Sequence, residues 1–87
     1  MDYVGSSLSD PLTIAIIGAG EVGRCHGEAF AQLGSQVQII GVADIDRDRA
    51  KALSRDLGTR DFIDYRDLCD LEPDVAVICL PHHLHLE

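Results

Sequence analysis

The chain has 87 residues, 46% of them hydrophobic and 25% charged, a composition typical of one small globular domain. Its 15 acidic residues outnumber its 7 Lys and Arg residues, giving a net charge of −8 and no basic stripe for nucleic acid. No apolar run approaches the ~18 residues of a membrane span, and the N-terminus lacks the features of a signal peptide. We therefore expect no nucleic-acid or membrane partner. Three cysteines without a C-x-x-C motif fit reduced thiols, so a cytoplasmic location is expected.

The first ten residues are small and polar, and we expect Met1–Asp10 to be a flexible leader to a domain over residues 11–87. The run Leu12–Ile17 is apolar nearly throughout, which is typical of a strand covered on both faces in a parallel sheet. A helix is expected over Glu21–Leu33, and Gly34 is expected to end it. The apolar stripe of this helix is expected at Val22, Cys25, Ala29, Phe30 and Leu33.

The middle of the chain repeats this order of strand and helix. A second continuous apolar run predicts a strand over Val37–Ala43. Asp46 is placed to cap the next helix, which Gly58 ends. The inward stripe of that helix is expected at Ala50, Leu53 and Leu57.

The last part of the chain adds a helix between two further strands. Asp61–Ile63 predicts a short strand, and Asp64 is placed to cap a helix over Tyr65–Leu71. That helix is expected to turn inward Tyr65, Leu68 and Cys69. The apolar run Val75–Leu80 predicts a fourth strand, which the loop Pro81–His85 follows. The alternation predicts an α/β fold, namely a partial Rossmann-type three-layer parallel sheet of about four strands with helices on both faces.

The pattern G-x-G-x-x-G, formed by Gly18, Gly20 and Gly23, joins the first predicted strand to the first predicted helix. In this setting the first glycine permits a tight turn, the second lets the backbone approach a pyrophosphate, and the third lets helix and strand pack closely. The N–H groups at the helix start favour negative charge, so Glu21 and Val22 are candidates to bind phosphate through the backbone. The stretch predicts a dinucleotide site; a tight turn that merely needs glycine is the alternative.

Asp44 lies about 20 residues after the glycine pattern, at the end of the second predicted strand. A carboxylate there accepts hydrogen bonds from both hydroxyls of an adenosine ribose and repels a 2′-phosphate, so NAD is expected in preference to NADP. Arg47 keeps NADP open, because an arginine at this place can accommodate a 2′-phosphate or stack on adenine. Ile45 is assigned to the same adenosine side.

Other polar residues carry weaker signals. Arg24 is placed to reach a pyrophosphate or to remain a solvated surface arginine. Three of the four histidines, His82, His83 and His85, crowd one short loop, which is weak evidence for a metal site, and no metal is expected. No nucleophile–base pair is visible, so no catalytic residue is assigned.

Three blocks give the chain a resemblance to a known family. Residues 14–26 hold a strand, a glycine loop and a histidine; residues 41–46 hold a second strand with its acid; residues 74–85 end in P-x-x-x-H. Together they resemble the N-terminal half-domain of the Gfo/Idh/MocA family of glucose–fructose oxidoreductases and inositol dehydrogenases. The resemblance implies that the final loop lines the cofactor near the nicotinamide, with contacts from Leu80, Pro81, His82 and His85.

For the whole protein, the resemblance implies NAD(P)-dependent oxidation of a sugar or polyol-like alcohol by hydride transfer. The family's E-K-P segment and its second α/β domain, which binds the substrate, are not among these 87 residues. We therefore expect the chain to hold the cofactor-binding portion of such an oxidoreductase and to be inactive by itself.

Two other functions use the same features. A regulatory Rossmann module that senses a nucleotide needs the same glycine loop. A self-associating half-Rossmann unit is the other alternative, because a fourth strand without a neighbour would expose an apolar sheet edge to a second copy.

Overall fold

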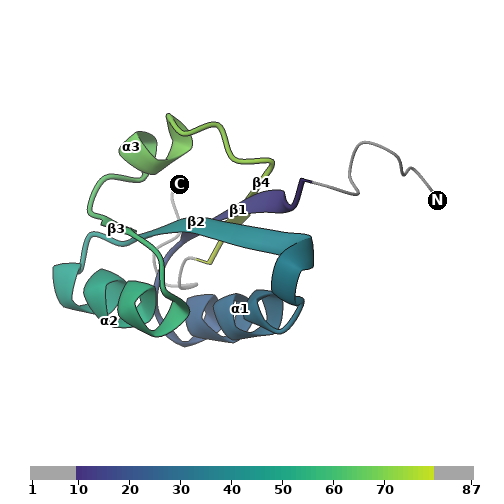
Figure 1. The fold of residues 1–87 in the computed structure, drawn as a ribbon. Coiled ribbons are helices and arrows are strands. Elements are labelled where there is room, and N and C mark those ends of the chain that lie inside the picture. Colours follow the sequence, from purple (N-terminus) through teal and green to yellow (C-terminus); the bar gives the residue numbers. More distant parts are fainter. Residues whose placement is uncertain (1–9, 80–87) are drawn as a thin grey trace.

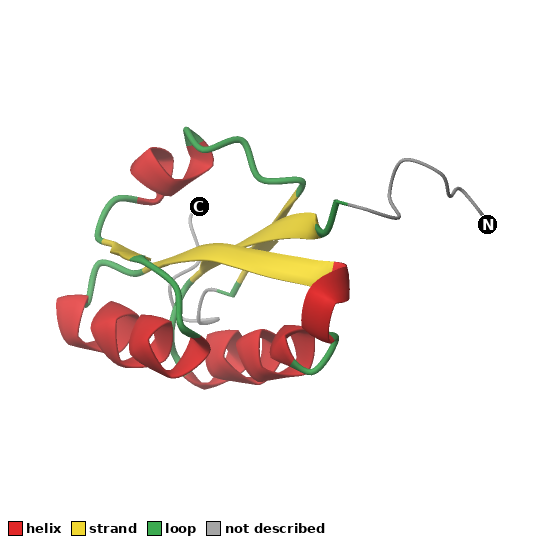
Figure 2. Cartoon of the chain, viewed as in Figure 1, coloured by secondary structure: helices red, strands yellow, loops and turns green. Residues whose placement is uncertain are grey.

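The computed structural model describes residues 10–79, which form one four-stranded parallel sheet between two layers of helices (Figure 1). The elements in chain order are β1 (Leu12–Ile17), α1 (Glu21–Ala31), a 3-10 helix (Gly34–Gln36), β2 (Val37–Ala43), α2 (Arg47–Leu57), β3 (Asp61–Phe62), α3 (Tyr65–Cys69) and β4 (Val75–Ile78). The strands lie in the order β3-β2-β1-β4. Helices α1 and α2 cover one face of the sheet and α3 covers the other (Figure 2). The predicted α/β Rossmann-type fold is confirmed.

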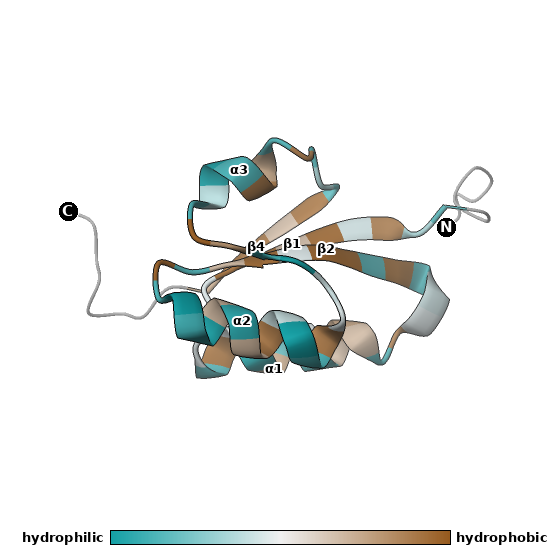
Figure 3. Cartoon of the chain, turned by 60° about the vertical axis from the view of Figure 1, so that its left-hand side comes forward, coloured by the Kyte–Doolittle hydropathy of each residue, from teal (hydrophilic) through white to brown (hydrophobic). Residues whose placement is uncertain are grey.

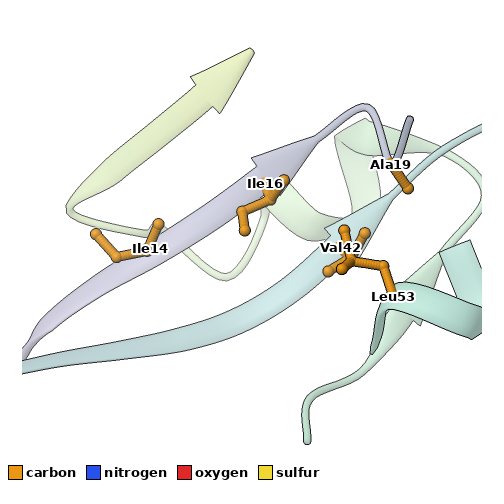
Figure 4. Packing of buried hydrophobic residues seen from close by; sticks show 5 residues of the cluster. All are labelled: Ile14, Ile16, Ala19, Val42 and Leu53. Carbon is orange, nitrogen blue, oxygen red and sulfur yellow. The ribbon is translucent and has the colours of Figure 1, made fainter. Parts of the chain in front are cut away.

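Strand β1 is buried from Ile14 to Ile17 because both of its faces are covered there. Ile14 and Ile16 point toward α1 and α2, where they form a cluster with Val42 and Leu53 (Figure 4). Between them, Ala15 points to the opposite face, where a second cluster forms from Ala15, Ala43 and Leu68. This burial on both sides explains why the apolar run is continuous rather than alternating.

The predicted helix caps are confirmed at α2 and α3. Asp46 accepts hydrogen bonds from the backbone N–H groups of Asp48 (3.1 Å) and Arg49 (3.2 Å). Asp64 accepts one from the N–H of Arg66 (2.9 Å). These bonds satisfy N–H groups that have no partner within the helix, so each carboxylate defines where its helix begins.

The apolar stripe predicted for α1 is wrong, apart from the half-buried Phe30 that packs against the core. Its other four members are exposed: Val22, Cys25, Ala29 and Leu33. The buried positions of α1 are Gly23 and Gly27. A Cβ on Gly27 would lie 2.6 Å from Leu57 Cδ1 and 3.2 Å from Ile16 Cδ1. The inward face of α1 therefore carries glycines because larger side chains do not fit there. A prediction based on large apolar residues overlooks such a face.

Several predicted boundaries also differ from the structure. Helix α1 ends at Ala31, and Gly34 begins the 3-10 helix instead of ending α1. Helix α3 ends at Cys69 after five residues, so it has room for one inward side chain, and Tyr65 and Cys69 are exposed while Leu68 is buried. Strands β3 and β4 are shorter than predicted, ending at Phe62 and Ile78. Residues 1–9 of the predicted leader and the residues from Leu80 onward lie outside the described residues.

Strand β4 is held beside β1 at both of its ends. At the start, the Asp74 carboxylate accepts hydrogen bonds from the backbone N–H (2.8 Å) and hydroxyl (3.1 Å) of Thr13, whose hydroxyl accepts one from the Asp74 N–H (2.8 Å). At the end, the Cys79 N–H donates to the Ile17 carbonyl (2.7 Å). Along residues 10–79, no helix is long and apolar enough to cross a membrane.

Candidate functional site

The loops after β1 and β2, together with the end of β4, surround an open pocket of about 860 Å³. These are the carboxyl ends of the parallel strands. Strands β2 and β3 lie on one side of β1 and β4 lies on the other, so the chain direction across the sheet reverses at this point. Open α/β sheets bind ligands at such a switch point, and the volume suits a small molecule.

Two glycines of the pattern are required by the turn itself. Gly18 has φ +103°, a conformation that L side chains rarely adopt. A Cβ on Gly18 would collide with the carbonyl oxygen of Cys79, and a Cβ on Gly23 would collide with the carbonyl oxygen of Gly18. The close approach of β1, α1 and the end of β4 therefore accounts for glycine at both positions.

Gly20 differs from these two glycines. Its backbone is extended (φ −77°, ψ −159°), and an added Cβ would meet the guanidinium of Arg49 only at 3.8 Å. The described contacts therefore do not require glycine here, yet its missing side chain leaves the start of α1 open to the pocket. The first backbone bond of α1 runs from the Arg24 N–H to the Gly20 carbonyl (2.9 Å), so the N–H groups of Glu21 and Val22 precede the helical ladder. This geometry offers donors and a positive dipole end to an anion.

Asp44 connects the glycine turn to β2. Its Oδ2 accepts a hydrogen bond from the Ala19 N–H (2.7 Å), and its Oδ1 accepts one from the Asp46 N–H (2.8 Å). Beside it, the Gly18 N–H donates to the Ala43 carbonyl (2.7 Å). An ionised carboxylate has about four lone-pair sites, so these two bonds leave two sites for ligand hydroxyls. Asp44 lines the pocket and is half-buried, as a ribose-binding acid would be.

Of the residues that follow Asp44, some line the pocket and others face solvent. Ile45 lines the pocket and is 84% exposed, which presents a free apolar surface to a ligand. Arg47, at the first position of α2, is exposed and does not line the pocket, whereas Arg49, two residues later, does. The structure thus gathers Gly18, Gly20, Glu21, Val22, Asp44 and Ile45 around one pocket.

Arg24 also reaches the edge of the pocket, but carboxylates of the helical layer hold it. Its Nη1 donates to Asp56 Oδ2 at 2.8 Å and lies 3.5 Å from Glu28 Oε2. The hydrogen bond to Asp56 is the main reason that the pKa of the Arg24 guanidinium is raised above its ordinary value. The arginine therefore ties α1 to α2.

The sequence did not indicate several of the described residues that line the pocket, namely Ile17, Ala19, Ala43, Asp46, Arg49, Ala52, Ile63, Tyr65 and Cys79. Cys79 closes the pocket beside Gly18 and is buried, and this burial raises the pKa of its thiol. Arg49 also lines the pocket, through a long side chain whose direction no local sequence pattern indicates. The assigned Leu80, Pro81, His82 and His85 lie outside the described residues.

Several known proteins contain a stretch that is similar to this chain. The profile of the Gfo/Idh/MocA oxidoreductase family, an NAD-binding Rossmann fold, matches residues 12–87. D-glucoside 3-dehydrogenase of Escherichia coli (strain K12) is 31% identical over 81 residues, which cover 91% of this chain and 23% of that protein. Arogenate dehydrogenase 1, chloroplastic, of Arabidopsis thaliana is 38% identical over 74 residues, which cover 85% of this chain and 11% of that protein.

A solved structure of a dehydrogenase has a fold similar to that of this chain. The WlbA dehydrogenase of Chromobacterium violaceum, in complex with NADH and UDP-GlcNAcA, has a TM-score of 0.79 and 25% identity. The likeness covers 87% of this chain and 22% of that one. The chain therefore spans less than a quarter of the length of these relatives, and its match to the family profile extends from β1 to its last residue. By this match, the chain belongs to the Gfo/Idh/MocA oxidoreductase family, in its NAD-binding Rossmann fold.

Proposed function

We propose that the pocket binds NAD and that this chain is the cofactor-binding portion of a sugar or polyol dehydrogenase. The observation that carries the proposal is Gly20, where glycine is not required by the protein's own contacts but keeps the N-terminus of α1 open. The N–H groups of Glu21, Val22 and Gly23 would hold the pyrophosphate. A bound dinucleotide explains why a side chain is missing here.

Asp44 would select the cofactor at the other end of the adenosine. Its two unused lone-pair sites suit the 2′- and 3′-hydroxyls of ribose, and its charge would oppose a 2′-phosphate. Ile45 would lie against the adenine, and Arg47 stays the candidate for a 2′-phosphate. Leu80, Pro81, His82 and His85 would line the nicotinamide half, a proposal that rests on the family resemblance.

The activity of the whole protein is proposed from its relatives. D-glucoside 3-dehydrogenase and the sugar-nucleotide-bound WlbA dehydrogenase indicate a carbohydrate alcohol as the substrate. The arogenate dehydrogenase shares the same stretch of sequence, but the glucoside and WlbA dehydrogenases together favour the carbohydrate class. When bound, NAD supplies the acceptor for a hydride from the alcohol carbon. The free cysteines Cys25, Cys69 and Cys79 fit a reducing, cytoplasmic compartment.

Calorimetric titration of the 87-residue chain with NAD and with NADP tests the proposal. We expect NAD to bind weakly, with a Kd on the order of 1 mM, because the pocket is open to solvent. NADP should bind about tenfold more weakly because Asp44 repels its 2′-phosphate. Equal affinity for both would refute the role of Asp44, and no heat with either at several times that concentration would refute the site.

We also propose that β4 can pair with β4 of a second copy. In the described sheet β4 lies at the edge, and its residues Val75–Ile78 include no charge or proline that would protect an edge. Figure 3 shows the hydrophobic colouring of β4, and Ile78 is 65% exposed. Sedimentation at rising concentration should show a dimer. A monomer at millimolar concentration would contradict this pairing.

A further inference from the structure

The pocket has few cations to offer an anionic ligand. Among the described residues that line it, three carry carboxylates, namely Glu21, Asp44 and Asp46, and two carry guanidinium groups, namely Arg24 and Arg49. The whole chain adds a net charge of −8, so its overall field opposes an anion. A ligand with two phosphates therefore depends on the helix N-terminus and on whichever guanidinium can reach it.

The two arginines differ in how firmly carboxylates hold them. Arg24 donates a 2.8 Å hydrogen bond to Asp56 and has Glu28 as a second partner. Arg49 lies beside Asp46 at 3.6 Å between Nε and Oδ2, a distance too long for a strong hydrogen bond, and its side chain is 58% exposed. Moving Arg49 toward a ligand thus costs less than moving Arg24.

The guanidinium of Arg49 also lies next to the open glycine. Its Nη1 is 3.8 Å from the position that a Cβ of Gly20 would occupy. The space left by that missing side chain is therefore bounded on one side by the N-terminus of α1 and on the other by Arg49 of α2. A phosphate bound to the first N–H groups of α1 would have a guanidinium within hydrogen-bonding reach.

We propose that Arg49 contacts the diphosphate of the nucleotide and sets the affinity for its charge. This inference rests on the proposed NAD site and adds a cation from α2 to it. The guanidinium exchanges its loose pairing with Asp46 for charge-assisted hydrogen bonds to the phosphate oxygens. Asp46 keeps its bonds to the N–H groups of Asp48 and Arg49, so α2 stays capped during the exchange.

The test compares ADP and adenosine as probes for the wild-type chain, Arg49→Gln and the control Lys51→Gln. Lys51 is an exposed cation on the same helix that does not line the pocket. We expect Arg49→Gln to weaken ADP about five- to tenfold and to change adenosine less than about twofold. Lys51→Gln should change neither affinity more than about twofold, and Arg49→Lys should restore part of the loss. The difference between wild type and Arg49→Gln should shrink at high salt.

Amide spectra and calorimetry give the affinities without any need for catalysis. Unchanged ADP affinity in Arg49→Gln, or an equal loss of ADP and adenosine, would overturn the role of Arg49. With 2′-AMP as a third probe, a loss of affinity for 2′-AMP alone would also overturn this role, because that result places the guanidinium at the 2′-position. If the wild-type chain binds neither ADP nor NAD, the proposed NAD site itself fails; if it binds both and Arg49→Gln behaves like wild type, only this inference fails.

Discussion

The Asp44 carboxylate holds the glycine turn through the Ala19 N–H. Its remaining lone-pair sites are the ones that we propose bind a ribose. Sequence patterns predict the ribose-binding role, because an acid at the end of the second strand is part of the dinucleotide fingerprint. They say nothing of the bond to Ala19, because a hydrogen bond between residues 25 positions apart depends on how the turn and β2 meet in space.

Removing this carboxylate should therefore loosen the turn as well as the ribose site. We expect Asp44→Ala to lower the free energy of unfolding by about 1–3 kcal/mol, because the part-buried Ala19 N–H loses its acceptor. Amide hydrogen exchange should become faster at Ala19, and urea unfolding should report the lost stability. Asp70→Ala, at an exposed carboxylate, should stay within about 0.5 kcal/mol of wild type. Unchanged exchange at Ala19 would show that Asp44 does not hold the turn.

The three cysteines should differ in reactivity. Burial raises the pKa of the Cys79 thiol, so less of the reactive thiolate is present at a given pH, and the sulfur is also shielded. Cys25 and Cys69 are exposed. Alkylation with iodoacetamide at about pH 8, followed by peptide mass spectrometry, should modify these two cysteines first. Equal rates at all three would contradict the buried position of Cys79.

At the scale of elements, the strands and caps follow from local chemistry and the inward face of α1 does not. Asp46 and Asp64 cap their helices as predicted, because a short carboxylate side chain reaches the adjacent N–H groups whatever the rest of the fold does. The inward face of α1 depends on how closely β1 and α2 approach it. Only the structure shows that Gly23 and Gly27, rather than Val22 or Leu33, occupy that face.

This difference can be measured by placing valine on each of two faces of α1. Gly27→Val should destabilise the fold by about 1–3 kcal/mol, because its side chain would press on Leu57 and Ile16. Ala29→Val, on the exposed face, should cost under about 1 kcal/mol, which is the difference in helix propensity. Urea denaturation of both variants supplies the comparison. A smaller loss in Gly27→Val than in Ala29→Val would contradict the close packing.

At the scale of the whole molecule, the order β3-β2-β1-β4 creates the site. The alternation of strands and helices predicts a parallel sheet, and the right-handed crossover rule predicts helices on both faces. The turn after β1 meets Asp44 from β2 and Cys79 from the end of β4 because β1 lies between those two strands. Asp44 and the glycines can be predicted from their residue types and spacing. Arg49 reaches the same pocket from α2, and the direction of its long side chain cannot be predicted from a local sequence pattern.

Titration of the ¹⁵N-labelled chain with NAD, followed by amide chemical shifts, tests the proposed site most directly. The open start of α1 predicts that the largest shifts fall on the N–H groups of Gly20, Glu21 and Val22, with a second group around Ala19 and Ile45. Leu68 and Cys69 of α3, which do not line the pocket, should change little. Shifts that are absent at the glycine turn with NAD in the millimolar range, or that gather at Leu68 and Cys69 instead, would contradict the proposed NAD site.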